Sequence, residues 1–525
     1  MGKIIETKLV RWDGGMVNDP RDSRENTARV VTNFDILTDS YKMTPYRSSE
    51  SGDSAPTTSK KKNFCVALRT GTTYSLYSLG VISGTAKAEV LFKDLTTGAS
   101  NDLDDSGWAT PSNNQSSAGT SATDLFVNYK LAGLIIGARA GTNLWAFSPT
   151  GSVWSDSWQA LTYTNIAQGL VHSKDDILYI PYDNKIATYN HTGTAYNATA
   201  LTLPSHLYIT SICEDGNYLL IGCAPLSGVG YSVVYKWDRD SSLATLADSI
   251  SWGEETLKIL DKIDGIVVGI SLSGGNSTRF SDRVICRYLS GDSAVKIPGL
   301  EFLGGTTTIL PIAKQKINNR LYFMMQITLN GAVREGVWSI GRNNSNSPMT
   351  VIHERTPNND TALTNGALYN FFSVGDYMFI SYADNSSEAL SKTDDTATYS
   401  ATSIYESKIF NAGDSSLKKD LIGTTLMYEK LAAGASATVK YRVDGATSWT
   451  TIFTDAVDDS ISHSAINIES TGATLPKDYK EIEFRLESIN AKITAFSFME
   501  EITAKRLYMA LWEAIMSFGA SLIRK

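Results

Sequence analysis

A hairpin-like unit recurs along most of this chain, and it constrains the fold more than any other feature. Its clearest copy, Gly216 to Asp238, reads GNYLLIGCAPLSGVGYSVVYKWD: a turn, a short apolar strand, a Gly-rich loop and a second strand. Tyr, Val, Leu and Ile fill both runs, and Gly or Asn bounds them, which is typical of a β-hairpin. One hairpin cannot bury its apolar face alone, so the pattern predicts copies that pack on one another.

The copies are degenerate but regularly spaced. Their first strands begin at Asn63, Ala132, Asp176, Gly216, Asp264, Asn319 and Gly375. Apart from a long first interval of roughly 70 residues, the spacings of roughly 41 to 57 residues lie near the period of one four-stranded propeller blade. The spacing therefore predicts a six- or seven-bladed β-propeller over residues 51–400. A β-sandwich or a β-solenoid remains as the alternative, because Gly-turn hairpins occur in all β folds.

The copy that opens at Gly375 has no recognisable partner strand in the sequence. Residues 1–50 contain short apolar runs, such as Lys8–Trp12 and Asn33–Leu37, that are suited to strands. A closed ring often completes one blade with strands from both ends of the array. We therefore expect residues 1–50 to form an N-terminal arm and strands that complete the propeller.

The pattern changes after residue 400. The runs Ala437–Val443 and Ile482–Glu487 alternate apolar and polar or charged residues, and Asp444-Gly445 provides a hairpin turn between strands. One buried and one solvated face is typical of two packed antiparallel sheets. Residues 401–499 are therefore predicted to form a separate β-sandwich, which makes the whole chain an all-β protein with a helix at its end.

Residues 500–525 differ again, because EEITAKRLYMALWEAIMSFGASLIRK has helical propensity with acids first and bases last. Apolar side chains cover more than half of its circumference, so we expect a C-terminal helix that is buried by assembly with copies of itself or with a neighbouring protein. Docking on its own chain and contact with a membrane are the alternatives. The apolar stretch is just short of a convincing membrane span.

Composition excludes several classes of function. The net charge of −8 gives no basic surface for nucleic acid. The cysteines lie singly in or beside apolar strands, which indicates buried free thiols and a reducing compartment rather than a zinc site. They are Cys65, Cys213, Cys223 and Cys286. The N-terminus also lacks the apolar core of a secretion signal.

No catalytic constellation is apparent, so we expect no catalytic, cofactor-binding or metal-binding residues and no enzyme activity. The histidines fall singly, and Asp264 and Asp376 precede strands where turn residues are expected. Aromatic side chains that could stack on sugars are Trp145, Trp154, Trp158, Trp237, Trp252 and Trp338. Because most of these lie in or beside apolar strands, packing between blades is the favoured interpretation.

Two segments carry a resemblance to a known class of proteins. The opening Trp12-Asp-Gly-Gly-Met-Val-Asn-Asp-Pro-Arg-Asp22, with Val31–Asp35 and Thr44–Arg47, resembles the start of tailed-bacteriophage virion proteins. Val439–Gly445 and Tyr479–Glu487 are similar to a module that is common in phage tail proteins. The resemblance covers roughly residues 8 to 500, its motifs are moderately specific, and the C-terminal helix lies outside it.

The resemblance implies a non-enzymatic structural component of a virion, in the tail: a nozzle- or hub-type ring subunit, or part of a fibre. It would be made in the host cytoplasm and would assemble with other tail or portal-proximal proteins and with copies of itself. The expected assembly residues are Trp12, Arg21, Leu507, Tyr508, Leu511, Trp512, Ile515, Met516 and Leu522. The alternatives are a glycan-binding propeller that recognises a host surface and, less favoured, a glycoside hydrolase or lyase.

Overall fold

The computed structural model confirms an all-β chain whose only helical element among the described residues is the single 3-10 turn η1 (Lys130–Ala132). The chain divides into two compact units, and each is described by itself. The described residues are 3–17, 26–46, 49–51, 59–82, 85, 87–99, 102–103, 107–117, 121–139, 141–227, 230–240, 249–253, 255–273, 283–303, 308–329, 332–342, 348–358, 363, 366–385, 387–393, 402–412, 416–465 and 475–502.

The larger unit, called the array unit, comprises the described residues within Ser49–Met349 and Arg355–Ala397. Its strands form small antiparallel sheets that follow one another along the chain. The first four sheets are β6 (Ser59–Thr70), β7 (Thr73–Ile82) and β8 (Ala88–Asp94); β9 (Ser121–Tyr129), β10 (Leu134–Arg139), β11 (Asn143–Ser148) and β12 (Val153–Ala160); β13 (Leu170–Val171), β14 (Leu178–Tyr182), β15 (Lys185–Asn190) and β16 (Ala195–Thr202); and β17 (Leu207–Asp215), β18 (Tyr218–Pro225), β19 (Ser232–Trp237) and β20 (Ser249–Gly253).

Three more sheets complete the array unit. They are β21 (Thr256–Ile263), β22 (Ile266–Ser273), β23 (Arg283–Ser290) and β24 (Ser293–Leu303); the part of a larger sheet that this unit contains, β25 (Thr308–Ile317), β26 (Arg320–Leu329) and β27 (Ala332–Gly341); and β29 (Ala367–Val374), β30 (Tyr377–Asp384) and β31 (Ser387–Thr393) with β5 (Ser49–Ser51). Each recurring hairpin of the sequence maps onto two neighbouring strands of one sheet; Gly216 to Asp238, for example, covers β18 and β19.

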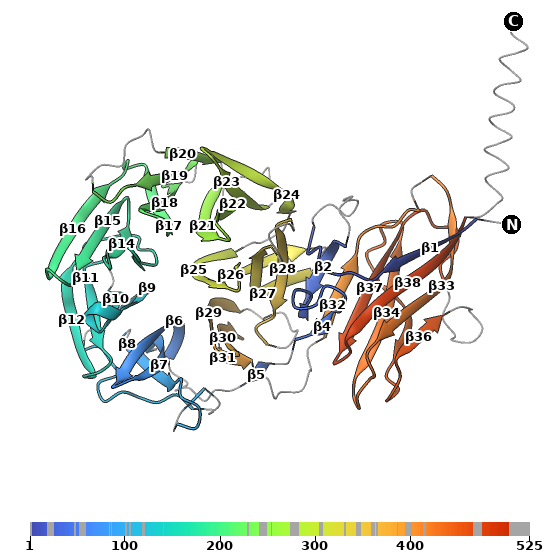
Figure 1. The fold of residues 1–525 in the computed structure, drawn as a ribbon, viewed down its shortest axis with the longest axis horizontal. Coiled ribbons are helices and arrows are strands. Elements are labelled where there is room, and N and C mark those ends of the chain that lie inside the picture. The colour runs from blue at the N-terminus through green and yellow to red at the C-terminus, as the bar shows by residue number, and fades with distance from the viewer. Residues whose placement is uncertain are drawn as a thin grey trace, which may run out of the picture. The chain divides into compact units, whose positions relative to one another are not determined.

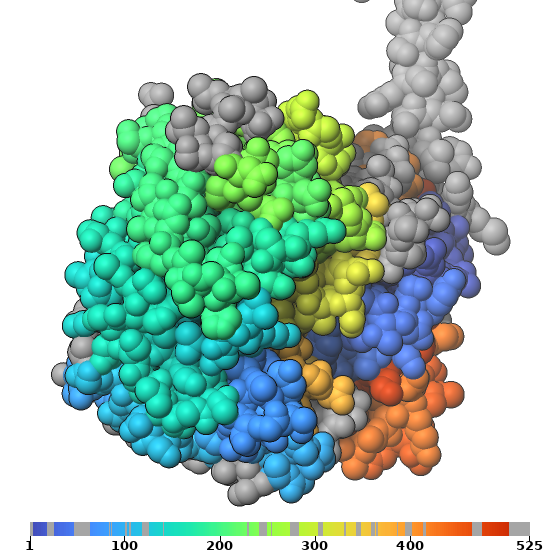
Figure 2. Space-filling view, turned by 60° about the vertical axis from the view of Figure 1, so that its left-hand side comes forward, coloured from blue at the N-terminus to red at the C-terminus, as the bar shows by residue number. Residues whose placement is uncertain are grey.

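The sheets of the array unit follow one another in a cycle (Figure 1). The first strand of each sheet contacts the sheet before it, and β29 of the last sheet contacts β6 of the first. Figure 2 shows one face of this unit, on which the sheets succeed one another in chain order from blue through green to yellow. Apolar cores lie between neighbouring sheets, including the last and the first, where Phe372 lies 6.4 Å from Phe64 between ring centroids.

Short turns join the strands, and several depend on residues that tolerate positive φ. Asp264 and Gly265, between β21 and β22, have φ of 46° and 75°. Asp and Asn adopt this conformation more readily than other residues with a side chain, and Gly does so freely. The interpretation of Asp264 and Asp376 as turn residues is confirmed, since both lie in two-residue turns between strands.

The last sheet departs from the expectation for residues 1–50. Only β5 joins it, pairing with β31 from Ser51↔Ser391 to Ser49↔Thr393. Of the strands that precede β5, Lys3–Leu9 pairs with Ile493–Ile502 and Ala28–Thr32 pairs with Ser403–Ser407, while the two short strands that follow pair with each other; all four belong to the other unit. The apolar side chains of the strand Ala28–Thr32, such as Val30 and Val31, are buried there, which is the physical reason for the difference.

The second unit, called the two-sheet unit, comprises the described residues within Met1–Ser48, Thr350–Glu354 and Thr398–Lys525. It also contains the small pair β3 (Phe34–Asp35) and β4 (Thr44–Pro45). Within this unit one sheet has the order β1 (Lys3–Leu9), β38 (Ile493–Ile502), β33 (Lys419–Tyr428) and β36 (Ser462–Ala465); the other has the order β28 (Thr350–Arg355), β2 (Ala28–Thr32), β32 (Ser403–Ser407), β37 (Ile482–Ile489), β34 (Ser436–Val443) and β35 (Thr450–Asp455).

Aromatic side chains fill the space between these two sheets. Phe484 of β37 lies 4.9 Å from Phe496 and 4.6 Å from Phe498 of β38, between ring centroids. All three side chains are buried. The predicted boundary near residue 400 lies close to the observed change of unit at Ala397, whereas residues 1–48 share the C-terminal unit, an arrangement that the sequence did not predict.

Candidate functional site

The expected assembly residues fall into two groups in the structure. Trp12 is fully buried in the two-sheet unit, with its ring 5.1 Å from that of Tyr405 in an edge-to-face arrangement. Trp12 therefore packs inside its own chain and offers no side-chain surface to a partner, which corrects the expectation for this residue. Arg21 and the predicted helix residues Leu507, Tyr508, Leu511, Trp512, Ile515, Met516 and Leu522 lie outside the described residues.

The tryptophans considered for sugar stacking are mostly core residues. Trp145, Trp237, Trp252 and Trp338 are at most 2% exposed. Trp154 and Trp158 are half-buried and rest on other rings: Trp154 lies 4.8 Å from Trp145, and Trp158 lies 4.7 Å from Tyr189. Packing, the favoured interpretation, is confirmed for the four buried rings.

The four cysteines are buried free thiols, as the sequence indicated. Burial raises the pKa of Cys213 and Cys286 to about 12, and it also raises the pKa of Cys65 and Cys223. Such thiols are poor nucleophiles and poor metal ligands. Within the described part of the chain, no three His, Cys, Asp or Glu side chains are grouped in a way that could hold a metal ion.

The most extensive polar feature is a circle of hydrogen bonds between neighbouring sheets of the array unit. Each junction between consecutive sheets has at least one, and together they run from the first sheet back to it. In order, they join Asn128 Nδ2 to the Val66 carbonyl (2.7 Å), Gln168 Nε2 to the Phe126 carbonyl (2.9 Å), the Ile209 amide to the Asp183 carbonyl (2.7 Å), Ser211 Oγ to the Leu260 carbonyl (3.1 Å), Lys314 Nζ to the Leu260 carbonyl (2.8 Å), Gln315 Nε2 to the Ser373 carbonyl (2.8 Å), and Asn370 Nδ2 to Asn63 Oδ1 (2.9 Å).

Most of these bonds are donated by polar side chains on the first strand of a sheet, which is an edge strand of that sheet. Most of these side chains bond to a backbone carbonyl of a neighbouring sheet, and a buried backbone carbonyl without a partner would be costly. Gln315 bonds to both backbone groups of Ser373: its Nε2 donates to the carbonyl, and its Oε1 accepts from the amide at 2.7 Å. The circle therefore fixes each sheet to the next.

A charged cluster reinforces the junctions between β17, β21 and β25. Lys314 Nζ donates to Ser211 Oγ (2.9 Å) and lies 3.3 Å from Asp261 Oδ2, while Lys316 Nζ lies 3.3 Å from Asp261 Oδ1. Burial alone would raise the pKa of Asp261, but the two lysines outweigh it and hold the pKa below its ordinary value. The carboxylate is thus kept ionised as a structural counter-charge.

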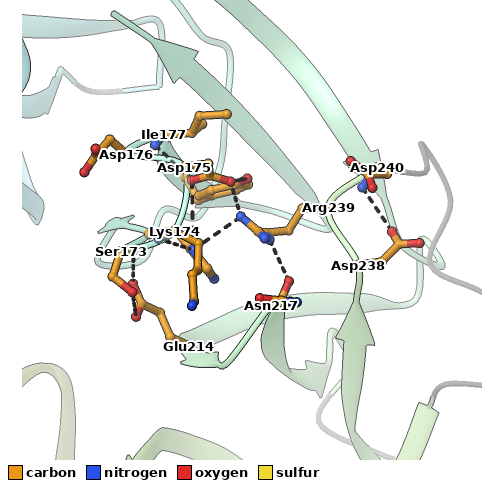
Figure 3. A network of polar contacts seen from close by, with 12 residues as sticks. Ser173, Lys174, Asp175, Asp176, Ile177, Glu214, Asn217, Asp238, Arg239 and Asp240 are labelled. Carbon is orange, nitrogen blue, oxygen red and sulfur yellow. Dashed lines mark hydrogen bonds and ion pairs between the residues drawn. The ribbon is translucent and has the colours of Figure 1, made fainter.

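A second network joins residues of the third and fourth sheets and of the turns next to their strands (Figure 3). Arg239, just after β19, donates through Nη1 to the carboxylate of Asp175, and its Nε donates to the Asn217 carbonyl at 2.9 Å. Beside it, Glu214 accepts from the Ser173 amide at 2.7 Å and from the Ser173 hydroxyl at 2.9 Å. The carboxylates of Asp175 and Glu214 already accept hydrogen bonds from groups of this chain. The network is therefore suited to holding two sheets together rather than to proton transfer.

Sequence reasoning did not single out the residues of the circle. A lone Asn, Gln, Ser or Lys within a strand gives no pattern, and its partner lies in another sheet. Lys314-Gln-Lys316 is the one local hint, because this polar run interrupts an otherwise apolar strand next to a turn.

Comparison of the chain with models of known protein families finds no match, and comparison with curated proteins finds no significant similarity. No helix within the described residues has the length and apolar character that crossing a membrane requires.

Proposed function

We propose that this chain is a non-enzymatic structural component of a tailed-bacteriophage virion, in the tail, as a nozzle- or hub-type ring subunit or part of a fibre. In this proposal the array unit is a seven-bladed β-propeller and the two-sheet unit is a β-sandwich. The protein would work as one copy among several, in contact with other tail or portal-proximal proteins.

The circle of hydrogen bonds between consecutive sheets carries the proposal. Every junction of the array unit has a polar contact, most of them beside an apolar core, and the contact between Asn370 and Asn63 links the last sheet to the first. A closed array fixed in this way provides rigid faces and loops, as a subunit that bears contacts on several sides needs. The resemblance of the opening segment and of Val439–Gly445 to phage tail proteins points in the same direction.

The arrangement of aromatic and acidic residues favours this function over the two alternatives. A glycan-binding surface needs exposed rings, whereas four of the six tryptophans considered are buried and the other two rest on neighbouring rings. A glycoside hydrolase needs two carboxylates at a set separation across the substrate. Asp261 is engaged by two lysines and Asp175 by Arg239, so neither is free for that role.

The mass of the purified chain in solution tests the proposal. The full chain is compared with a chain that ends at Ile502, because β38 extends to Ile502 and an earlier end would remove part of a central strand. We expect a discrete large oligomer for the full chain and a smaller species for the shortened one. Leu511→Glu should act like the shortening, and Glu513→Lys, on the same segment, serves as the matched control.

Two results would overturn the proposal. One is a full chain that has the same mass as the shortened chain at every concentration tested. The other is cleavage of a polysaccharide by the full chain, measured as release of reducing ends, because this would make the protein an enzyme.

A further inference from the structure

The strand β1 leaves one edge of its sheet open. It pairs with β38 along its whole length, from Lys3↔Ile502 to Leu9↔Phe496, and among the described residues no strand pairs with its other side (Figure 1). Unpaired amide and carbonyl groups on such an edge are a template for another strand.

Several other long edge strands are interrupted, whereas this one is not. The edge strands β12, β16, β20 and β24 of the array unit all pair with a shift of register, which bends an edge and discourages further pairing. The ladder of β1 has no such shift, and the strand contains neither Pro nor Gly. An uninterrupted edge of seven residues is long enough to receive a partner.

We propose that a second copy of this chain pairs with β1, antiparallel and with Thr7 opposite Thr7, so that two copies join through a two-fold axis. The sequence of the strand carries the argument. From residue 4 of the strand to Val10, the residue just after it, the sequence reads Ile-Ile-Glu-Thr-Lys-Leu-Val, so each residue meets a complementary one when this stretch is paired with itself. This contact uses residues 4–10, whereas the assembly test above depends on residues 503–525.

The outward-facing side chains select this register. Glu6 and Lys8 have side chains 45% and 62% exposed, and Ile4 and Val10 are 59% and 49% exposed. With Thr7 at the centre, each Glu6 lies opposite a Lys8, and each Ile4 lies opposite a Val10. If the pairing is centred on residue 6 or residue 8 instead, Glu6 lies opposite Glu6 or Lys8 lies opposite Lys8. If it is centred between two residues, the outward-facing side chains of one copy lie opposite the inward-facing side chains of the other. Cross-strand pairs of opposite charge stabilise a sheet, and like charges destabilise it.

The inward-facing side chains fit the same arrangement. Ile5, Thr7 and Leu9 lie on the side of the sheet that faces the aromatic layer, because Leu9 pairs with Phe496 and Thr7 with Phe498. They are only half-buried, since the sheet ends at β1. A second copy places its Leu9 beside Ile5 and continues the apolar layer across the axis.

A single cysteine at the axis tests this contact in the full chain. In the proposed pair the two Thr7 Cα atoms lie about 4.5 to 5.5 Å apart, within the range of a disulfide. Thr7→Cys should therefore form a covalent dimer on mild oxidation, seen on a non-reducing gel. Lys8→Cys is the matched control, because its two copies lie about 8 Å apart and should not cross-link. The native cysteines are buried, so they do not compete.

Charge variants provide a second and independent measurement. Lys8→Glu places like charges across both copies and should raise the dissociation constant of the dimer about tenfold or more. The double exchange Glu6→Lys with Lys8→Glu restores opposite charges and should restore the wild-type constant. Equal cross-linking of Thr7→Cys and Lys8→Cys, or a double exchange that is no better than Lys8→Glu, would overturn the proposal. Cross-linking does not depend on ring assembly, so the two proposals can fail separately.

Discussion

Replacing Lys314 by Met tests whether the polar circle holds the array unit together. Met has a similar length but lacks the ammonium group, which donates to Ser211 Oγ at 2.9 Å and to the Leu260 carbonyl at 2.8 Å. The side chain of Lys314 is only 12% exposed, so water cannot easily replace the lost donor. Asp261 would keep its ion pair with Lys316 and its hydrogen bond from the Lys262 amide.

The expected loss follows from these contacts. Hydrogen bonds to a charged group contribute about 1.5 to 3 kcal/mol each, and removing the buried lysine also removes the cost of desolvating it. Together these effects predict that Lys314→Met lowers the free energy of unfolding by about 3 kcal/mol. Lys316→Met is the matched control. Its ammonium pairs with the same carboxylate but is 56% exposed, so about 0.5 kcal/mol is expected.

Urea unfolding followed by tryptophan fluorescence measures both variants, since Trp252 and Trp338 are buried in the array unit. The pH dependence gives a further check. The depressed pKa of Asp261 contributes stability above its unfolded pKa, which is lost as pH falls through the folded pKa. The loss in free energy of unfolding that Lys314→Met causes should therefore be largest at neutral pH and become smaller below about pH 4. If Lys314→Met and Lys316→Met are equally stable at pH 7, the argument from the circle fails.

Three further predictions follow from buried groups. Burial raises the pKa of Glu500 despite its hydrogen bond from Tyr479, so this group lowers stability as pH rises above about 4.3. Glu500→Gln should flatten that slope in thermal melts between pH 4 and 7, and an unchanged slope would contradict it. Gly137→Ala would place a Cβ 2.0 Å from Trp145 and should cost about 3 kcal/mol. Gly71→Ala, with open space but φ of +55°, should cost about 1 kcal/mol; equal costs would refute the packing argument. The four buried thiols should resist a thiol reagent at pH 8 until the protein is unfolded, and rapid labelling of the folded chain would show otherwise.

The sequence predicted the strands that are apolar on both faces. The hairpin Gly216 to Asp238 is β18 and β19, the two middle strands of a sheet, and these are flanked by protein on both sides. The first and last strands of a sheet have mixed composition and gave a weaker pattern. The missing partner of Gly375–Ser381 is β31, SEALSKT, which is mostly polar and so did not read as a strand.

Contacts between distant segments could not be predicted in this way. Lys3 pairs with Ile502, and Asn370 bonds to Asn63, but neither pair leaves a trace in local periodicity. The predicted strand Lys8–Trp12 shows the same limit. The observed strand is β1, Lys3–Leu9, because its register is determined by pairing with β38, and Trp12 turns into the core.

The pairing of β1 with β38 has a mechanical consequence. Because the strands are antiparallel and Lys3 lies opposite Ile502, tension applied across these two residues pulls on one end of the ladder. The hydrogen bonds then break one after another from that end of the ladder, instead of bearing the load together as they would in shear. Detaching β1 is therefore the low-force route, and it frees the edge of β38 while the remaining strands of that sheet stay paired.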